Sequence, residues 1–353
     1  MSWPAAGQSA VGVVGSPDLE THGSQKATPT ASTAKLITAL VVLRAKPLAP
    51  GQPGPVITLT PSDVAIYNAY FVHDSSLVKV RAAERITEYQ MLQAMLLPSA
   101  NNMADSLAIW AFGSLKAYSG AANSYLAQLG LAQTKVGTDA SGFAPSTTST
   151  ARDLVRIGEL VMQNPVLAQI VGQPGASGIP VVNNIKNVNF LLGSDGVVGI
   201  KTGNTDQSGG VFVSASKVQI NGEPVTIVTT LAGSPSLFQA LKDSLPLIKS
   251  AQANFKPVKP VTKGTVVGHY KLPWGGSVAA VASKNLSLTA WNGSSVTSTT
   301  ELQPVAATAQ AGQTAGSIKV SKSAVSKQIS VPVKLQTAPT TPSLWWRLFH
   351  PFN

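Results

Sequence analysis

Ser32 and Lys35 are the residues of this chain whose types and spacing most directly suggest chemistry. Residues three apart on a helix lie on one face, one turn apart, so a helix beginning near Ser32 would place Lys35 over its hydroxyl. A serine hydroxyl becomes a good nucleophile only when an adjacent base takes its proton. A lysine can be that base if burial or a second cation lowers its pKa. The pair therefore suggests nucleophilic catalysis, although a serine N-cap followed by a solvated lysine fits the same residues.

Two further polar stretches lie downstream of this pair. Ser99 and Asn101 form a Ser-x-Asn that follows an apolar helical pattern and Pro98. Residues 201–203 read Lys-Thr-Gly, and a strand-rich run follows them. The order Ser-x-x-Lys, Ser-x-Asn, Lys-Thr-Gly is the three-part signature of penicillin-recognising serine enzymes. Each part is a weak signal by itself, whereas three parts in this order strongly favour such a site.

On these motifs the chain resembles the serine-type D-Ala-D-Ala carboxypeptidases, the low-molecular-mass penicillin-binding proteins of a peptidase S11-like family. The resemblance runs from about residue 10 to about residue 248 and continues more faintly to the C-terminus. It implies removal of the terminal D-alanine from peptidoglycan stem peptides through an acyl-enzyme on Ser32. It also implies β-lactams as covalent inhibitors, and it implies no cofactor.

The resemblance assigns catalytic roles to Ser32, Lys35 and Ser99. Lys35 would take the proton from Ser32, and Ser99 would relay a proton toward the leaving amine. Lys201 would lie close to Lys35, and its positive charge would keep Lys35 neutral for part of the time.

The resemblance assigns substrate binding to Asn101, Lys201, Thr202, Gly203 and Asn204. Asn101 would orient the substrate backbone, and Thr202 with Lys201 would hold the terminal carboxylate. Gly203 would let the substrate approach the strand closely. The oxyanion would lie between the backbone N–H groups of Ser32 and Asn204.

The implied fold class is α+β: a serine β-lactamase/DD-peptidase-like domain, with helices on an antiparallel sheet, followed by a small all-β domain. The patterns predict strands at residues 10–14, 20–23, 56–59, 76–80, 201–205, 209–215 and 225–232. They predict helices at residues 33–44, 103–112, 115–129, 150–162 and 236–250. A capping box at residues 87–90 predicts one more helix, and Ser62-Asp63 and Ser149 are expected caps.

The composition changes near residue 254, which predicts a catalytic domain at 1–253, a β-rich domain at 254–336 and a tail at 337–353. Strands are expected at residues 265–272, 277–282, 286–291, 317–321 and 329–333. Glu301 is the only acid among many lysines between residues 256 and 334, which fits either a solvated surface or binding to anionic wall or lipid. Residues 344–353 are rich in aromatics and predict an anchor on an anionic membrane surface, or else a strip that docks on the protein.

The composition bounds the remaining possibilities. The 353 residues are 44% hydrophobic and 12% charged, which is enough to build a core. The absence of cysteine excludes disulfides and thiolate catalysis. The net charge of +11 suits anionic partners, and the resemblance points to wall and lipid and not to nucleic acid. The resemblance also implies an extracytoplasmic protein on the outer face of the cytoplasmic membrane, with its export signal absent from this chain.

The sequence leaves three further functions open. A β-lactamase on the same fold would need a deacylating glutamate, for which Glu159 is the candidate, although it lies in a helical pattern. A DD-endopeptidase would use the same residues, and a non-catalytic wall-binding module would need none of them. His73-Asp74 is a poor basis for a Ser-His-Asp triad, and the four histidines show no metal-ligand spacing.

Overall fold

The computed structural model describes residues 1–17, 19–220, 222–291, 296–322 and 325–350. The chain divides into two compact units, the first made of Met1–Val14 and Leu19–Asn254 and the second of Gly15–Asp18 and Phe255–Asn353. The first unit thus ends at Asn254, beside the expected limit at residue 253. Residues 337–353, which we expected as a separate linker and tail, fall within the second unit.

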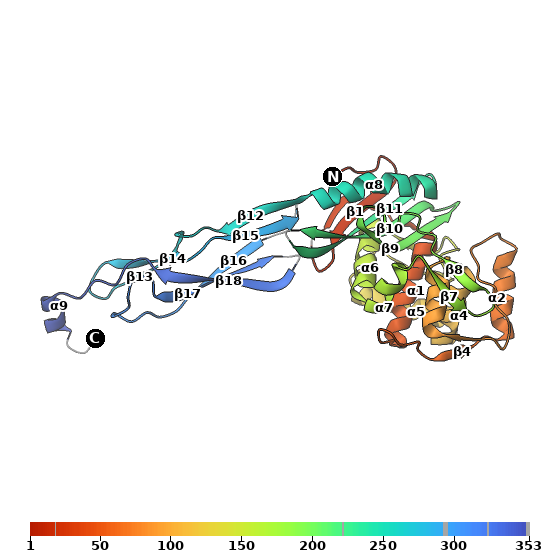
Figure 1. Ribbon diagram of the computed structural model, residues 1–353, viewed down its shortest axis with the longest axis horizontal. Coiled ribbons are helices and arrows are strands. Elements are labelled where there is room, and N and C mark those ends of the chain that lie inside the picture. The colour runs from red at the N-terminus through yellow and green to blue at the C-terminus, as the bar shows by residue number, and fades with distance from the viewer. Residues whose placement is uncertain (18, 221, 292–295, 323–324, 351–353) are drawn as a thin grey trace. The chain divides into compact units, whose positions relative to one another are not determined.

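A five-stranded antiparallel sheet forms the centre of the first unit (Figure 1). Its strand order is β2-β1-β11-β10-β9. The strands are β1 (Gln8–Val13), β2 (Leu19–His22), β9 (Val197–Thr205), β10 (Gly209–Ile220) and β11 (Glu223–Ser234). Residues 211–216 of β10 are all buried, as expected for a central strand that is covered on both faces.

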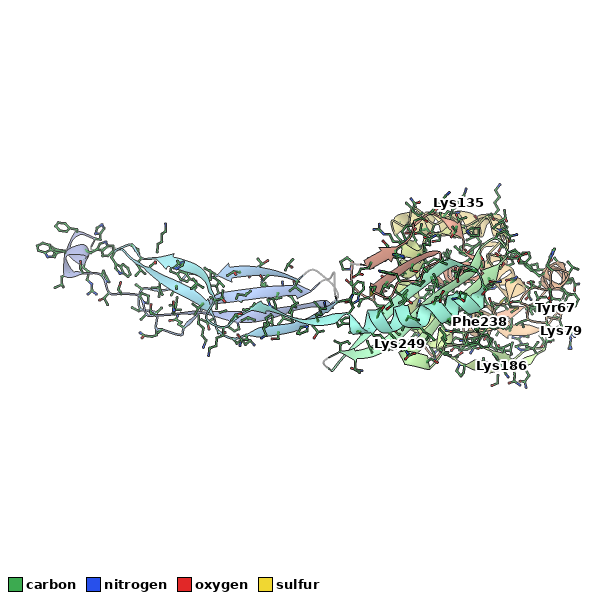
Figure 2. The ribbon with its side chains drawn as sticks, turned by 90° about the horizontal axis from the view of Figure 1, so that it is seen from above. Tyr67, Lys79, Lys135, Lys186, Phe238 and Lys249 are labelled. Carbon is green, nitrogen blue, oxygen red and sulfur yellow. The ribbon has the colours of Figure 1, made fainter. Side chains whose placement is uncertain are left out.

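Two helices cover this sheet, α6 (Ala151–Gln163) on one face and α8 (Leu237–Ala253) on the other (Figure 1). Gly158 allows α6 to approach closely, because an added Cβ would lie 2.8 Å from Cγ1 of Val228. Phe238 and Lys249 are both exposed on α8 (Figure 2), and Lys249 Nζ lies 3.4 Å from Asp195 Oδ1. The side of α8 that carries Leu241, Leu247 and Ile248 is buried, whereas the side that carries Phe238 and Lys249 faces solvent.

The remaining helices of this unit comprise α1, which carries Lys35, and helices that pack on it directly or through one another. They are α1 (Ala34–Ala45), α2 (Pro61–Phe71), α3 (Glu88–Leu96), α4 (Asn101–Phe112), α5 (Leu115–Gln128) and α7 (Pro165–Val171). Every residue of α1 from Ala34 to Leu43 is buried. A helix that is apolar almost all round belongs inside a domain, so α1 is the central helix of this layer.

Short two-stranded pairs link the helices. They are β3 (Thr28–Pro29) with β6 (Thr148–Ser149), β4 (Val56–Thr58) with β5 (Arg85–Thr87), and β7 (Gly175–Ile179) with β8 (Asn183–Lys186). The strand expected at residues 76–80 is wrong. The side chain of Asn102 accepts from Val78 N at 3.1 Å and donates to Val78 O at 2.8 Å, so an amide satisfies this backbone in place of a neighbouring strand.

The helix starts show which capping predictions hold. The capping box of Thr87 and Gln90 at the start of α3 is confirmed. Of the expected cap Ser62-Asp63, Asp63 does take part, because it forms a capping box with Thr60. Ser62 does not, since α2 begins at Pro61. The expected cap Ser149 is also wrong, since Thr150 Oγ1 accepts from Asp153 N at the start of α6.

The second unit is built from strands, apart from one short helix near the C-terminus. A five-stranded sheet has the order β13-β14-β18-β17-β16, and β12 pairs with β15. The bounds are β12 (Phe255–Val261), β13 (Val266–Lys271), β14 (Ser277–Ala282), β15 (Leu286–Trp291), β16 (Val296–Leu302), β17 (Thr314–Lys322), β18 (Val325–Leu335) and α9 (Leu344–Phe349). The five expected strands are confirmed, whereas β12 and β16 were not predicted because proline interrupts the first and Ser and Thr dominate the second.

Candidate active site

Ser32 lies in a single 3₁₀ turn, η1 (Ala31–Thr33), directly before α1. Ala31 has φ +46°, a left-handed conformation that costs a non-glycine residue about 1 to 3 kcal/mol. Thr30 holds the turn from the outside, because its N–H donates to Thr147 O at 3.1 Å. The chain therefore fixes the serine in a strained turn at the N-terminal end of a buried helix.

Lys35 is completely buried, and its ammonium group has three hydrogen-bond acceptors. Nζ donates to Ser32 Oγ at 2.8 Å, to Asn101 Oδ1 at 2.7 Å and to the Ser141 carbonyl at 3.0 Å. Burial lowers the pKa of Lys35 from 10.5 to about 7, although the negative charges of Asp139 and Asp105 act in the opposite direction. The interpretation of Lys35 as a solvated lysine is therefore wrong, and Lys35 can lose its proton near neutral pH while in contact with Ser32.

Ser99 and Asn101 lie at the junction between α3 and α4, and both are buried. Ser99 has φ +67°, a second left-handed residue beside the site. Asn101 uses its side-chain oxygen on Lys35, so it also fixes the lysine. Among the hydrogen bonds of the described residues, none joins Ser99 Oγ to Lys35, so the direct contact in this motif comes from Asn101.

Lys201, Thr202, Gly203 and Asn204 follow one another on β9. Lys201 is buried, and its Nζ donates to Thr202 O at 3.1 Å. A Cβ added at Gly203 would lie only 3.0 Å from Ser32 N, so the strand passes directly against the serine turn. The glycine of this motif is thus needed for close approach between β9 and η1 as well.

The two buried lysines differ from the sequence-based expectation in one respect. We expected the charge of Lys201 to lower the pKa of Lys35, but burial of Lys35 is the main cause. Burial and then the positive charge of Lys35 hold the pKa of Lys201 well below its usual range. The low-dielectric pocket therefore disfavours protonation of both lysines at once.

A cavity of about 640 Å³ opens in front of Ser32. Its lining combines Ser32 and Asn101 with Asn204, which directly follows the Lys-Thr-Gly motif. The remaining lining residues are His73, Asp74, Ser75, Ser76, Phe143, Ala144, Pro145, Thr205, Asp206 and Gln207. The three motifs, which lie far apart in the sequence, thus meet at one cavity that is large enough for a short peptide.

Sequence reasoning missed two buried carboxylates near Lys35. Asp105 of α4 accepts from Tyr70 Oη and from Ala140 N, both at 2.8 Å. Burial raises the pKa of Asp105 to about 6. Asp139 accepts several hydrogen bonds within its own turn. The Asp-x-Ser-Gly pattern was the signal in the sequence, but the pattern alone does not show that this turn lies beside Lys35.

Of the residues considered for other chemistry, Glu159 lies away from the Ser32 cavity, whereas His73 and Asp74 line it. Glu159 Oε2 accepts from Arg156 at 2.7 Å, and Glu159 lines a different cavity, of about 440 Å³, between α6 and residues 129–133. His73 and Asp74 line the Ser32 cavity, and the His73 ring lies 5.5 Å from the Phe143 ring. Within the described ranges, no group of His, Cys, Asp or Glu side chains is suited to hold a metal ion.

Comparison with known proteins identifies relatives for most of the first unit. Residues 19–232 match the family described as D-alanyl-D-alanine carboxypeptidase. The D-alanyl-D-alanine carboxypeptidase DacB2 of Mycobacterium tuberculosis is 34% identical over 194 residues, which are 53% of this chain and 62% of that protein. The D-alanyl-D-alanine endopeptidase of Escherichia coli K12 is 29% identical over 208 residues, which are 57% of this chain and 62% of that protein. The chain thus spans less than two thirds of the length of these curated relatives.

Solved structures match nearly the whole chain. Penicillin-binding protein 5 from Haemophilus influenzae superposes with a TM-score of 0.65 at 21% identity, over 94% of this chain and 97% of that one. Penicillin-binding protein 6B from Escherichia coli gives a TM-score of 0.67 at 20% identity, over 93% and 94% of the two chains. These likenesses confirm the expected α+β DD-peptidase fold with an all-β region after it.

Proposed function

The chain belongs to the D-alanyl-D-alanine carboxypeptidase family, and from this premise we propose that it is a serine-type D-Ala-D-Ala carboxypeptidase. Its substrates would be peptidoglycan stem peptides, from which it removes the terminal D-alanine through an acyl-enzyme on Ser32. The observation that carries the proposal is the buried Lys35 Nζ, 2.8 Å from Ser32 Oγ and with a pKa lowered to about 7. A neutral amine in contact with a hydroxyl is what general-base activation of a serine requires.

The first half of the reaction forms the acyl-enzyme. Ser32 Oγ attacks the carbonyl carbon of the penultimate D-alanine while Lys35 Nζ takes the hydroxyl proton. The backbone N–H groups of Ser32 and Asn204 stabilise the oxyanion, and each such donor contributes about 3 to 4 kcal/mol to lowering the barrier. Collapse of the intermediate breaks the C–N bond, and the proton from Lys35 passes to the leaving amine of D-alanine. Ser99 is the proposed relay for this proton, and substrate binding would have to bring it into contact.

The second half of the reaction returns the enzyme to its starting state. Water attacks the ester carbonyl and gives its proton to Lys35, and the ester bond to Ser32 Oγ breaks as that oxygen regains a proton. In the first half Lys201 and Thr202 bind the terminal carboxylate of the substrate, which leaves with D-alanine, and in both halves Asn101 orients Lys35 and the peptide backbone. A carboxylate beside Lys201 favours its protonated form, so substrate binding would itself place the second positive charge in the site.

Peptide mapping after incubation with a labelled penicillin tests this function. We expect a stable mass increase on the peptide that contains Ser32, and none in the Ser32→Ala variant. Protein that has not met penicillin should release D-alanine from a soluble D-Ala-D-Ala peptide, and the labelled protein should not. A label on a different serine, or no label on folded protein, would refute the assignment.

A DD-endopeptidase is the second candidate, because two of the curated relatives are endopeptidases, at 29% and 30% identity. It would use the same residues on a D-Ala–diamino acid cross-link in place of a terminal D-alanine. Digestion of cross-linked and of uncross-linked muropeptides in parallel separates the two activities.

A class A type β-lactamase and a non-catalytic wall-binding module have less support. Glu159 lies outside the Ser32 cavity, which disfavours the β-lactamase because its deacylating glutamate must reach the acyl-enzyme. Burial of a lysine destabilises the fold, and a non-catalytic wall-binding module would not need Lys35 to be buried.

We further propose that the protein acts extracytoplasmically and binds an anionic membrane surface through residues 344–353. Along the described chain, no helix is long and apolar enough to cross a membrane. The short helix α9 exposes Leu344, Trp345, Leu348 and Phe349, each by 71% or more. Large aromatic and aliphatic side chains in such a helix are suited to the interface between headgroups and acyl chains. Phe352, which we also expected to contribute, lies outside the described residues.

One residue of the same helix, Trp346, contacts the rest of the β-rich unit, as the alternative interpretation of the tail as a docked strip predicts. The Trp346 ring packs edge-on against the ring of Trp274, at a centroid distance of 5.6 Å. Trp274 Nε1 in turn donates to Thr340 O at 2.7 Å, which ties the preceding segment to the β-rich unit. We therefore propose that Trp346 attaches the helix and that its exposed face remains free to contact lipid.

A further inference from the structure

A buried turn beside Lys35 is organised by a single carboxylate. In this segment, residues 139–144, which we call the Asp139 turn, Asp139 Oδ1 accepts from the backbone N–H groups of Ser141, Gly142 and Phe143 at 2.8, 2.6 and 3.2 Å. It also accepts from Ser141 Oγ at 2.7 Å, while Oδ2 accepts from Ala144 N at 3.0 Å. An asparagine would replace one acceptor oxygen by an NH₂ donor, which would face an N–H group without a partner. The turn therefore requires a carboxylate at this position.

The Asp139 turn touches the catalytic groups through its backbone. The Ser141 carbonyl accepts from Lys35 Nζ at 3.0 Å, and the Ala140 carbonyl accepts from Thr38 Oγ1 at 2.6 Å. Gly142, at φ +75°, lies so close to the serine turn that an added Cβ would overlap the Ala31 carbonyl oxygen. One short turn thus contacts both the proposed base and the backbone that carries the nucleophile.

A second carboxylate fixes the turn from the opposite side. Asp105 of α4 accepts from Ala140 N at 2.8 Å and from Tyr70 Oη at 2.8 Å. The Asp139 turn is therefore bound to both α1 and α4. These hydrogen bonds fix the position of the turn relative to Lys35.

We propose that Asp139 is a positioning residue for the reaction of Ser32, because it holds the Asp139 turn so that the Ser141 carbonyl keeps Lys35 Nζ on the serine hydroxyl. This inference rests on the proposed function. The acceptors around Lys35 come from three separate segments: Ser32, Asn101 and the turn. Loss of the third acceptor would free the ammonium group to move away from Ser32.

The charge of Asp139 gives this role a signature that a purely structural residue would lack. The charged and titratable groups around Lys35 are Asp139 of the turn, Asp105 of α4, Lys201 of β9, Tyr70 of α2 and Tyr118 of α5. Asp139 and Asp105 raise the pKa of Lys35, in opposition to burial. Neutralising Asp139 should therefore lower the pKa of Lys35 further, and the base should stay neutral to a lower pH.

The test compares Asp139→Asn with Asp153→Asn in the full chain. Asp153 is a matched control, because it is equally buried and accepts from Thr134 Oγ1 and Gln133 N, but it lies on α6 and does not act on Lys35. The measurement is the rate of acylation by a fluorescent penicillin between pH 5 and 9, with circular dichroism as the check of folding. We expect Asp139→Asn to acylate roughly 10- to 100-fold more slowly at pH 8, since a lost buried partner and misplacement of the base act together. We also expect the acidic limb of its pH profile to move down by roughly one pH unit, while Asp153→Asn keeps the wild-type limb.

The outcomes separate this inference from the proposed function. If wild-type protein is not acylated at Ser32, the proposed function fails. If wild-type protein is acylated and folded Asp139→Asn matches it in rate and limb, the positioning role is overturned. A slower rate with an unmoved limb also overturns it, because that would be general loosening.

A gentler variant covers the case in which Asp139→Asn does not fold. Ser141→Ala removes one hydrogen bond to Asp139 and keeps the charge, so its limb should not move. A several-fold slower rate supports the positioning role provided that Ser141→Ala melts at the wild-type temperature, which excludes general loosening. A wild-type rate in Ser141→Ala would then overturn it.

Discussion

The two units of the chain differ in whether their charged side chains are buried. The first unit buries Lys35, Lys201 and Glu88 almost completely, and it buries Asp105 and Asp139 beside the serine. From Phe255 onward, no described charged side chain is buried. A buried charge destabilises a fold unless it is paired, so charges inside a domain indicate chemistry, whereas charges outside it indicate contact with solvent or a partner.

In the second unit, most of the described lysines are exposed to solvent. Its exposed lysines are Lys256, Lys259, Lys263, Lys271, Lys284 and Lys334. Lys319 pairs with Glu301 on the surface, where such a pair contributes about 0 to 1 kcal/mol. We therefore expect these lysines to affect binding of solvent or of a partner, and to contribute little to the free energy of unfolding.

Among substitutions of charged residues in the two units, Lys35→Ala should have the largest effect, and this effect should be on the rate of acylation. Loss of a general base slows a reaction by roughly 10² to 10⁴-fold, and we expect acylation by a penicillin to fall by that factor. Lys249→Ala removes an exposed lysine of the same unit and is the control, with an expected wild-type rate. Stopped-flow fluorescence with a labelled penicillin measures both, and rapid acylation in the Lys35 variant would require a different base.

The next largest effect should be confined to the tail. Deletion of residues 343–353 should abolish co-sedimentation with anionic vesicles and leave hydrolysis of a soluble peptide unchanged. Burial of a large apolar side chain contributes roughly 1.5 to 3 kcal/mol when complete, and insertion at an interface contributes less. In the full chain, Trp345→Ala should weaken vesicle binding directly because Trp345 is exposed, whereas Trp346→Ala should act by releasing the helix from Trp274.

The tail prediction has two contrary outcomes. If the truncated protein sediments as the full chain does, the tail is not the anchor. If truncation instead lowers the melting temperature and Trp345→Ala has no effect on sedimentation, α9 is a docked strip.

A smaller effect should come from Glu88, a buried carboxyl whose two oxygens have no hydrogen-bond partner among the described residues. Burial raises its pKa from 4.5 to about 7. Because the folded pKa exceeds the unfolded one, the stability from the neutral carboxyl is complete below about pH 4.5 and is lost as the pH rises through about 7. Glu88→Gln stays neutral, so it should raise the free energy of unfolding at pH 8, on the order of 1 to 3 kcal/mol, and change it little at pH 4.5.

Urea denaturation of the two proteins at both pH values measures this difference. Glu301→Gln is the matched control, because Glu301 is the exposed carboxylate of the second unit. An equal effect of Glu88→Gln at both pH values would show that Glu88 does not titrate in the folded state.

The smallest effect should come from the exposed lysines. Lys259→Ala combined with Lys284→Ala should change the free energy of unfolding by no more than about 0.5 kcal/mol, as is usual for surface substitutions. Binding to an anionic polymer should weaken modestly at low salt and match the wild type at high salt, where surface charges are screened. Unchanged binding at low salt would show that the lysines only solvate the strands.

The sequence by itself determined the family signature, the α+β class and most elements of regular structure. The motifs of Ser32, Ser99 and Lys201 are local, and the periodic apolar patterns of the helices are local too, so both can be read along the chain. The clearest failure came where a distant residue replaced a local rule. The strand expected at residues 76–80 is absent because the Asn102 side chain binds the backbone of Val78.

Only the tertiary structure decided what surrounds Lys35. Its pKa depends on burial by α1 and its neighbours and on the charges of Asp105 and Asp139, which lie 70 and more residues away in sequence. The Ser141 carbonyl that holds the lysine is a backbone group, and backbone groups are identical at every position of a sequence. Residue types could therefore indicate which side chains do the chemistry, but the desolvation and the backbone contacts that tune them exist only once the chain has folded.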